Sequence, residues 1–226
     1  MPGRNKLLVE VAGKPVLLWT LEHLLASQVQ QVVVVTGAAH LEMQQMVDSL
    51  PVGIVHNPDF QEGIGASIRA GVNAVAERAA GVFILLADQP TLQTGTINRF
   101  VEIFRAGEHR IVAAEYGEVV GNPALFHRNF FPELLALDGH EGARRVIQAR
   151  SDETVSVPFP GGAFDMDTPE NYARLSAMTG GPRTGVEAAS SGGRRFKSCR
   201  PDLATKWPCG PGRDRRAICL RESPAT

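Results

Sequence analysis

The chain has 226 residues, of which 43% are hydrophobic and 21% are charged. These proportions are ordinary for a globular protein, and the length suits one domain with a sizeable core. The net charge of −1 provides no electrostatic footprint for a nucleic acid or a membrane surface. No apolar run reaches the roughly 18 residues that span a bilayer. The first residues lack a secretory hydrophobic segment, so we expect a cytoplasmic protein.

Apolar residues recur with a regular period over residues 1–178, and we expect one folded domain there. From residue 179 to residue 226, Gly, Pro, Arg and Ser dominate and no helix or strand period survives. We therefore expect residues 179–226 to be a disordered tail. Codons for residues 194–199 can spell the stem and loop of a transfer-RNA T arm, and we hypothesise that the tail is read-through sequence.

Strand and helix patterns alternate along the body of the chain. Apolar residues at helical spacing predict helices over residues 17–25, 68–75 and 97–104. Runs rich in β-branched and other apolar residues predict buried strands at residues 31–37, 52–58 and 81–87. A hairpin-like pair then follows at 111–116 and 119–126, with helices at 129–137 and 141–150, a strand near 154–159 and a helix from Pro169.

Such alternation predicts an α/β fold. We expect three layers, in which a Rossmann-like, mostly parallel sheet carries helices on both faces. The pair of strands around Gly117 and Glu118 would supply a small antiparallel edge.

An acidic residue, Asp88, directly follows the predicted strand at 81–87. Ligands of open parallel sheets bind beyond the carboxyl ends of the strands. A carboxylate there suits Mg²⁺, which is held by one or two carboxylates together with substrate phosphates. Aspartate before Gln-Pro-Thr is also good turn chemistry, so this segment alone leaves both interpretations open.

Two further acidic residues, Asp165 and Asp167, precede the last helical pattern. Residues 168–170 suit the start of a helix and need no other role. Capping leaves Asp165 and Asp167 unexplained. We expect Asp167 to face Asp88 and complete a two-carboxylate Mg²⁺ site.

Two glycine-containing loops are candidate anion contacts. Residues 62–67 follow a strand and open a helix, so their backbone N–H groups and the helix dipole favour an anion or a nucleotide. A tight turn is the alternative interpretation. Gly3, Arg4 and Lys6 form a basic loop at the start of the chain, where a solvated basic end is the ordinary interpretation.

Taken in order, these segments resemble the molybdenum cofactor cytidylyltransferase branch of the MobA-like nucleotidyltransferases. The family loop Leu-Ala-Ala-Gly-x-Ser-x-Arg-Met-x-Gly-x-x-Lys appears here only by its end, in residues 1–8. The resemblance covers essentially residues 1–176. Its further matching segments are residues 13–17, 57–67, 86–90, 121–126, 139–144 and 165–170.

The resemblance implies a nucleotide-diphospho-sugar-transferase-like fold and transfer of CMP from CTP to the terminal phosphate of molybdopterin, with release of pyrophosphate. It implies that Asp88 and Asp167 bind Mg²⁺ and that Lys6 contacts a phosphate, so Lys6 and Asp88 are the catalytic residues. Residues 139–144 would line the acceptor side, and a molybdoenzyme or its chaperone would be a further partner. The implied nucleotide contacts are Gly3, Lys6, Gly65 and Ser67.

The chain departs from the family pattern in two places. His140 stands where the family commonly has Asp, which leaves the acceptor open. The first strand and most of the family loop are missing, so we expect domain 1–178 to be incomplete at its N-terminus, weakly stable and poorly active. Two alternatives stay open: a related nucleotidyltransferase using GTP or a sugar phosphate, and a non-catalytic nucleotide-binding accessory protein of molybdoenzyme maturation.

Overall fold

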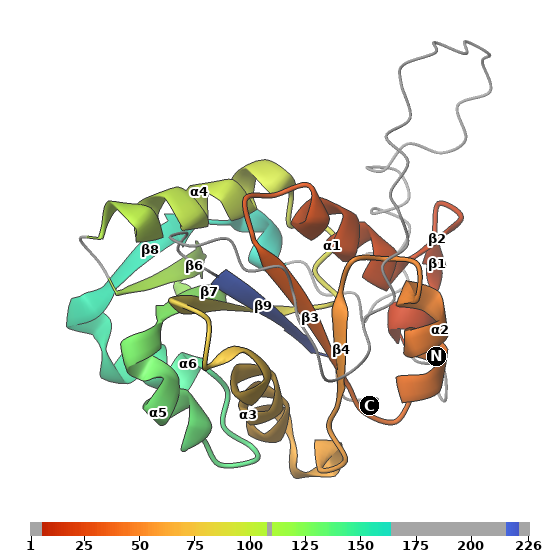
Figure 1. Cartoon of the computed structure of the whole chain (residues 1–226). Coiled ribbons are helices and arrows are strands. Elements are labelled where there is room, and N and C mark those ends of the chain that lie inside the picture. The colour runs from red at the N-terminus through yellow and green to blue at the C-terminus, as the bar shows by residue number, and fades with distance from the viewer. Residues whose placement is uncertain (1–5, 108–109, 164–215, 222–226) are drawn as a thin grey trace, which may run out of the picture.

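A computed structural model describes residues 6–107, 110–163 and 216–221 (Figure 1). A seven-stranded sheet lies between two layers of helices, which confirms the predicted α/β fold. Two helices, α1 and α4, cover one face, and three helices, α3, α5 and α6, cover the other (Figure 1). The bounds of the α-helices are α1 Val16–Leu25, α2 His40–Val47, α3 Ile64–Val75, α4 Thr94–Ala106, α5 Phe131–Leu135 and α6 Arg144–Ala149. Short 3₁₀ helices are η1 Lys6–Leu8, η2 Phe60–Glu62, η3 Arg128–Phe130, η4 Ser151–Glu153 and η5 Pro160–Ala163.

The strands of the main sheet lie in the order β4-β3-β9-β5-β7-β6-β8. Neighbouring strands are parallel except that β7 runs antiparallel to both β5 and β6. A separate antiparallel pair, β1 and β2, precedes α1. The bounds are β1 Glu10–Val11, β2 Lys14–Pro15, β3 Gln31–Thr36, β4 Gly53–His56, β5 Gly81–Leu86, β6 Ile111–Tyr116, β7 Val119–His127, β8 Thr154–Pro158 and β9 Arg216–Arg221.

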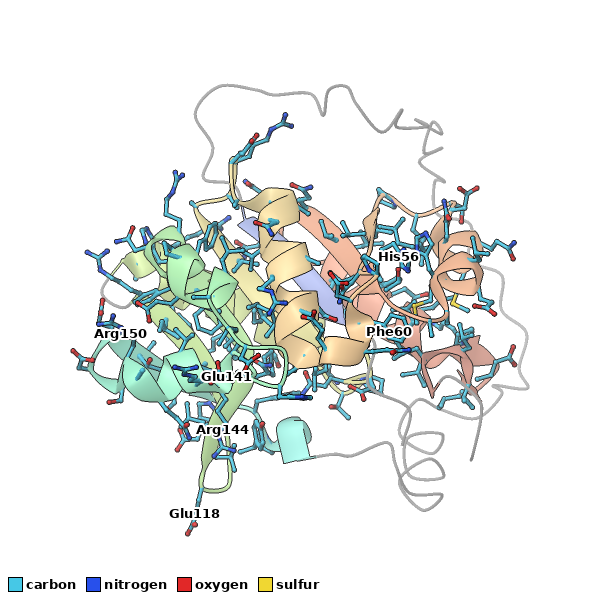
Figure 2. All side chains as sticks on the ribbon, turned by 90° about the horizontal axis from the view of Figure 1, so that it is seen from below. His56, Phe60, Glu118, Glu141, Arg144 and Arg150 are labelled. Carbon is cyan, nitrogen blue, oxygen red and sulfur yellow. The ribbon has the colours of Figure 1, made fainter. Side chains whose placement is uncertain are left out.

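The predicted hairpin is confirmed in β6 and β7, and Figure 2 shows Glu118 at its tip, pointing away from the body. Its expected place at the edge of the sheet is wrong, because β8 pairs with the outer side of β6. The physical reason is that β6 alone would leave a row of unpaired N–H and C=O groups. The chain returns through α6 and η4 and covers that row with β8, which also buries Val157.

Residues 216–221 depart from the expectation of a disordered tail. They form β9, which runs parallel to β3 on one side and to β5 on the other. No other described segment pairs with the facing sides of β3 and β5, so β9 completes the sheet between them. Residues 164–215 and 222–226, including the helix predicted from Pro169, lie outside the described residues.

The core lies on both faces of the sheet. In β3, Val32 and Val34 face the α1 and α4 layer, whereas Val33 and Val35 face the α3 layer. The same alternation recurs in β5, and it explains why both strands are continuous apolar runs in the sequence. On the helices, buried residues such as Leu21 recur at helical spacing and contact one face of the sheet.

Helix α2 was not predicted, since only Met43 and Val47 of its residues are buried and its apolar pattern is weak. In the part of the chain that is described, no helix is both long and apolar enough to cross a membrane.

Candidate active site

The parallel strands end at one edge of the sheet, and the loop after β5 carries Asp88 there. Asp88 is half-buried and lies in the turn that follows Leu86. The hydroxyl of Thr20 in α1 donates a hydrogen bond of 3.0 Å to the carbonyl oxygen of Ala87. The N–H of Leu92 donates to the carbonyl oxygen of Gln89 at 3.0 Å. These two bonds hold the backbone on both sides of Asp88.

The chain approaches the second acidic pair from beside this same loop. The hydroxyl of Thr91 donates to the carbonyl oxygen of Gly161 at 3.1 Å. Asp165 and Asp167 lie outside the described residues, so their expected pairing with Asp88 stays a prediction. Among the described residues, Gly161 lies beside the loop that carries Asp88.

Of the four expected nucleotide contacts, Gly65 and Ser67 lie in α3. Gly3 lies outside the described residues, and Lys6 begins η1, with only its backbone described. Ser67 lies in the first turns of α3, where its hydroxyl accepts a hydrogen bond of 3.1 Å from the side-chain amide of Asn57. Both side chains are buried. The oxygen of that amide accepts from the N–H of Asp59 at 3.1 Å, so Asn57 fixes the loop after β4 to α3.

Gly65 is explained by a close approach of backbone. Its N–H donates to the carbonyl oxygen of Gly139 at 2.8 Å. A Cβ on Gly65 would lie 1.8 Å from the carbonyl oxygen of Asp138, so no larger residue fits without displacing that loop. Gly63, with a φ of +117°, meets the same loop. This contact accounts for the two glycines without a nucleotide, and the nucleotide role of Gly65 stays a prediction.

The loop of residues 138–142 overlaps the predicted segment 139–144. It thus contacts the other predicted segment, the glycine-containing residues 62–67 at the start of α3. Arg69 ties them, since its guanidinium donates to the carbonyl oxygen of Leu137 and to the carboxylate of Glu62, both at 2.7 Å. His140 and Arg144 are exposed on this loop and on α6. Figure 2 labels Arg144 together with Glu141, which belongs to the same loop.

Glu141 stabilises the loop from within. The hydrogen bond from Arg145, and after it the bond from the N–H of Asp138, lower the pKa of the Glu141 carboxyl below its ordinary value. The Glu141 side chain is 31% exposed and that of Arg145 is 63% exposed, so solvent screens the effect of this ion pair on stability. The loop therefore keeps its ion pair at any pH near neutrality.

Several polar residues at this edge were not singled out from the sequence. The hydroxyl oxygen of Thr36, at the end of β3, lies 2.8 Å from Nδ1 of His40. The rings of His40 and His56 stack with their centroids 4.6 Å apart. Asn57 directly follows β4. The available signal was position, because each of Thr36, His56 and Asn57 ends or directly follows a strand.

Two further observations concern cavities and metal ligands. An open cavity of about 400 Å³ lies between the start of α4 and the end of β8. It is lined by Gly95, Thr96, Arg99, Val157 and Pro158. Within the ranges that the structure describes, no three His, Cys, Asp or Glu side chains lie together as a metal site.

The sequence profile of the MobA-like NTP transferase domain family matches residues 1–155. The chain belongs to this family. It is a nucleotidyltransferase, and its sheet with helices on both faces agrees with the nucleotidyltransferase structures that it resembles.

Three relatives carry different names. The chain is 31% identical to purine catabolism protein PucB of Bacillus subtilis over 186 residues, which is 75% of this chain and 87% of the relative. It is 28% identical to nicotine blue oxidoreductase of Paenarthrobacter nicotinovorans, over 77% of this chain and 85% of the relative. It is 23% identical to molybdenum cofactor cytidylyltransferase of Escherichia coli, over 63% of this chain and 72% of the relative. The chain is thus similar to relatives with three different names, and the family profile places it among the MobA-like NTP transferase domains.

Among solved structures, the chain is similar to Rv0371c of Mycobacterium tuberculosis, which was solved in complex with manganese. The TM-score is 0.65 at 26% identity, over 78% of this chain and 94% of that one.

Proposed function

We propose that this MobA-like nucleotidyltransferase transfers CMP from CTP to molybdopterin and releases pyrophosphate. The observation that carries the proposal is the carboxylate of Asp88 at the carboxyl-terminal edge of the sheet, on a loop fixed by Thr20. Similarity to the cytidylyltransferase of E. coli supports the choice of substrates.

The donor chemistry of this edge fits Mg²⁺. Asp88 offers a carboxylate oxygen, the kind of ligand that hard divalent cations prefer. Asp167 would supply the second carboxylate, because the chain enters residues 164–167 beside Thr91. The manganese complex of Rv0371c supports a divalent cation in this family. When bound, Mg²⁺ would neutralise charge on the triphosphate during transfer.

The remaining work falls to positioning. An oxygen of the acceptor's terminal phosphate attacks the α-phosphorus of CTP, and the bond from that phosphorus to the bridging oxygen of the β-phosphate breaks, so pyrophosphate leaves. No side chain becomes covalently modified. Lys6 would neutralise phosphate charge, and residues 139–144 would hold the acceptor against the start of α3.

A second candidate is nucleotidyl transfer with GTP or to a sugar phosphate. Its GTP form is favoured by similarity to phosphoenolpyruvate guanylyltransferase of Rubrobacter xylanophilus, which is 27% identical over 53% of this chain and 60% of the relative. The family membership applies equally to both candidates, because the profile describes the NTP transferase domain and not its substrates.

The test measures pyrophosphate release by the full 226-residue chain with Mg²⁺ and molybdopterin, offered CTP, GTP, ATP or UTP in turn. We expect the highest rate with CTP. Asp88→Asn keeps the shape of the side chain and removes its charge, so it should lower the rate roughly 100-fold or more. Asp48→Asn, at an exposed carboxylate at the end of α2, is the matched control and should keep the rate.

Other outcomes contradict the proposal in distinct ways. A rate that is highest with GTP, or that appears only with a sugar phosphate as acceptor, supports the second candidate. No release with any nucleotide supports the non-catalytic accessory protein. A fully active Asp88→Asn variant would remove Asp88 from the mechanism.

A further inference from the structure

Two buried amide oxygens have no hydrogen-bond partner among the described residues. One is Oε1 of Gln89, whose residue is only 7% exposed, and the other is Oδ1 of Asn122. Buried polar atoms are nearly always hydrogen-bonded, because water otherwise solvates them better. An unpaired pair at one end of a sheet therefore indicates something that binds there.

The topology places both oxygens at the same edge. Gln89 follows Asp88 in the loop after β5. In the antiparallel ladder of β5 and β7, Ile84 pairs with Ala124. This is the last paired position, and Asn122 lies two residues beyond it, in the direction in which β5 runs to its end at Leu86.

A bulge sets Asn122 apart from the ladder. Ala113 of β6 pairs with Ala124, whereas Ala114 pairs with Gly121, so Asn122 and Pro123 have no paired residue on β6. Bulges are over-represented at sheet edges and next to active sites, where they re-aim a side chain or end the pairing. Regular pairing between β6 and β7 is therefore interrupted at Asn122, which carries the second unpaired oxygen.

The two sides of Asp88 differ in what they can bind. Ser67 and Asn57, which border the expected nucleotide contacts, belong to α3 and to the loop after β4. They lie with β3 and β4 on one side of β5, and Asn122 lies on β7 at the other side. The phosphate end of the acceptor would meet the nucleotide near α3, where residues 139–144 would hold it, so the β7 side is left for the ring end of the acceptor.

We propose that Gln89 and Asn122 bind the heterocycle of the acceptor, and that their amide oxygens accept hydrogen bonds from its N–H groups. The inference rests on the proposed function. Ionised phosphate oxygens only accept hydrogen bonds, so they cannot satisfy another acceptor. The amino and lactam N–H groups of a pterin can. Gln89 and Asn122 therefore recognise the ring end of the acceptor and not its phosphate.

The test is Gln89→Met in the full chain, which keeps the length of the side chain and removes the amide. We expect KM for molybdopterin to rise about 3- to 10-fold, the value of one hydrogen bond, with KM for CTP unchanged. The midpoint of urea unfolding should stay the same or rise, because an unpaired buried oxygen has gone. Gln45→Met, at an exposed glutamine in α2, is the matched control and should change neither KM.

A second variant, Asn122→Leu in β7, should also raise KM for molybdopterin. A merely structural role predicts the opposite pattern, with lower stability and equal effects on both substrates, and that result overturns the inference. An active chain in which both variants keep the wild-type KM for molybdopterin also overturns it, while the proposed function stands. If the wild-type chain neither binds molybdopterin in a direct titration nor releases pyrophosphate with it, the proposed function fails and the inference falls with it.

Discussion

At the scale of single residues, Thr20 links the packing of α1 to the chemistry of the edge. Its side chain is fully buried, and its hydroxyl is the described partner of the Ala87 carbonyl. Asp88 follows directly, so the direction of its carboxylate depends on this bond. A threonine in an apolar helix face is otherwise out of place among the leucines around it.

We predict that Thr20→Val lowers the free energy of unfolding by about 1–3 kcal/mol, since the Ala87 carbonyl stays buried without its partner. The rate of pyrophosphate release should fall several-fold as the loop of Asp88 loosens. Urea unfolding and initial rates measure the two effects. Thr20→Ser keeps the hydroxyl and should retain most of the rate. An equal loss of rate in the serine variant would show that packing, and not the hydrogen bond, positions the loop.

At the scale of elements, the contact between α3 and the loop of residues 138–142 joins two segments that are far apart in sequence. The N-terminal turn of α3 gives its Gly65 N–H to this loop, so that group does not point at an open anion site. Arg69 and Glu141 stabilise the arrangement from the two sides.

Gly65→Ala tests that contact. A Cβ 1.8 Å from the Asp138 oxygen forces the loop away, and we expect a loss of about 1–3 kcal/mol in the free energy of unfolding. Gly95→Ala in α4 is the matched control, because no atom lies within 4 Å of its Cβ. It should stabilise the chain by up to about 1 kcal/mol, since alanine is the better helix former. Equal effects of the two variants in urea unfolding would contradict the close contact.

At the scale of the whole molecule, the sheet is completed by a strand from the end of the chain. Because β9 has a parallel neighbour on each side, its backbone N–H groups face a partner strand whichever way they point. Without it, β3 and β5 would expose facing edges in the middle of the sheet.

We predict that Ile218→Pro destabilises the fold by at least about 1–3 kcal/mol, because proline removes a ladder N–H and leaves its acceptor unpaired. Ile218→Val keeps the N–H and should stay within about 1.5 kcal/mol of the original chain. Circular dichroism during urea unfolding, with light scattering for aggregation, gives both readouts. A proline variant as stable as the valine variant would show that β9 contributes little to the sheet.

Local patterns in the sequence determined most of the elements and the position of Asp88 at the edge of the sheet. The strands β3 and β5 could be predicted as continuous apolar runs because both of their faces are buried. The helices α1, α3 and α4 could be predicted from their amphipathic pattern because only one face of each is buried. Asp88 follows from the same logic, since a carboxylate directly after a buried strand has to lie at the edge of the sheet.

Tertiary structure decided everything that depends on which strands become neighbours. It placed β8 outside the hairpin, inserted β9 between β3 and β5, and seated residues 138–142 on Gly65. It also gave Gly65 a contact in backbone packing, and placed Asn122 two residues beyond the last pair of the β5–β7 ladder, towards the end of β5. These outcomes rest on pairings between segments tens of residues apart or more, for which a single sequence carries no periodic signal.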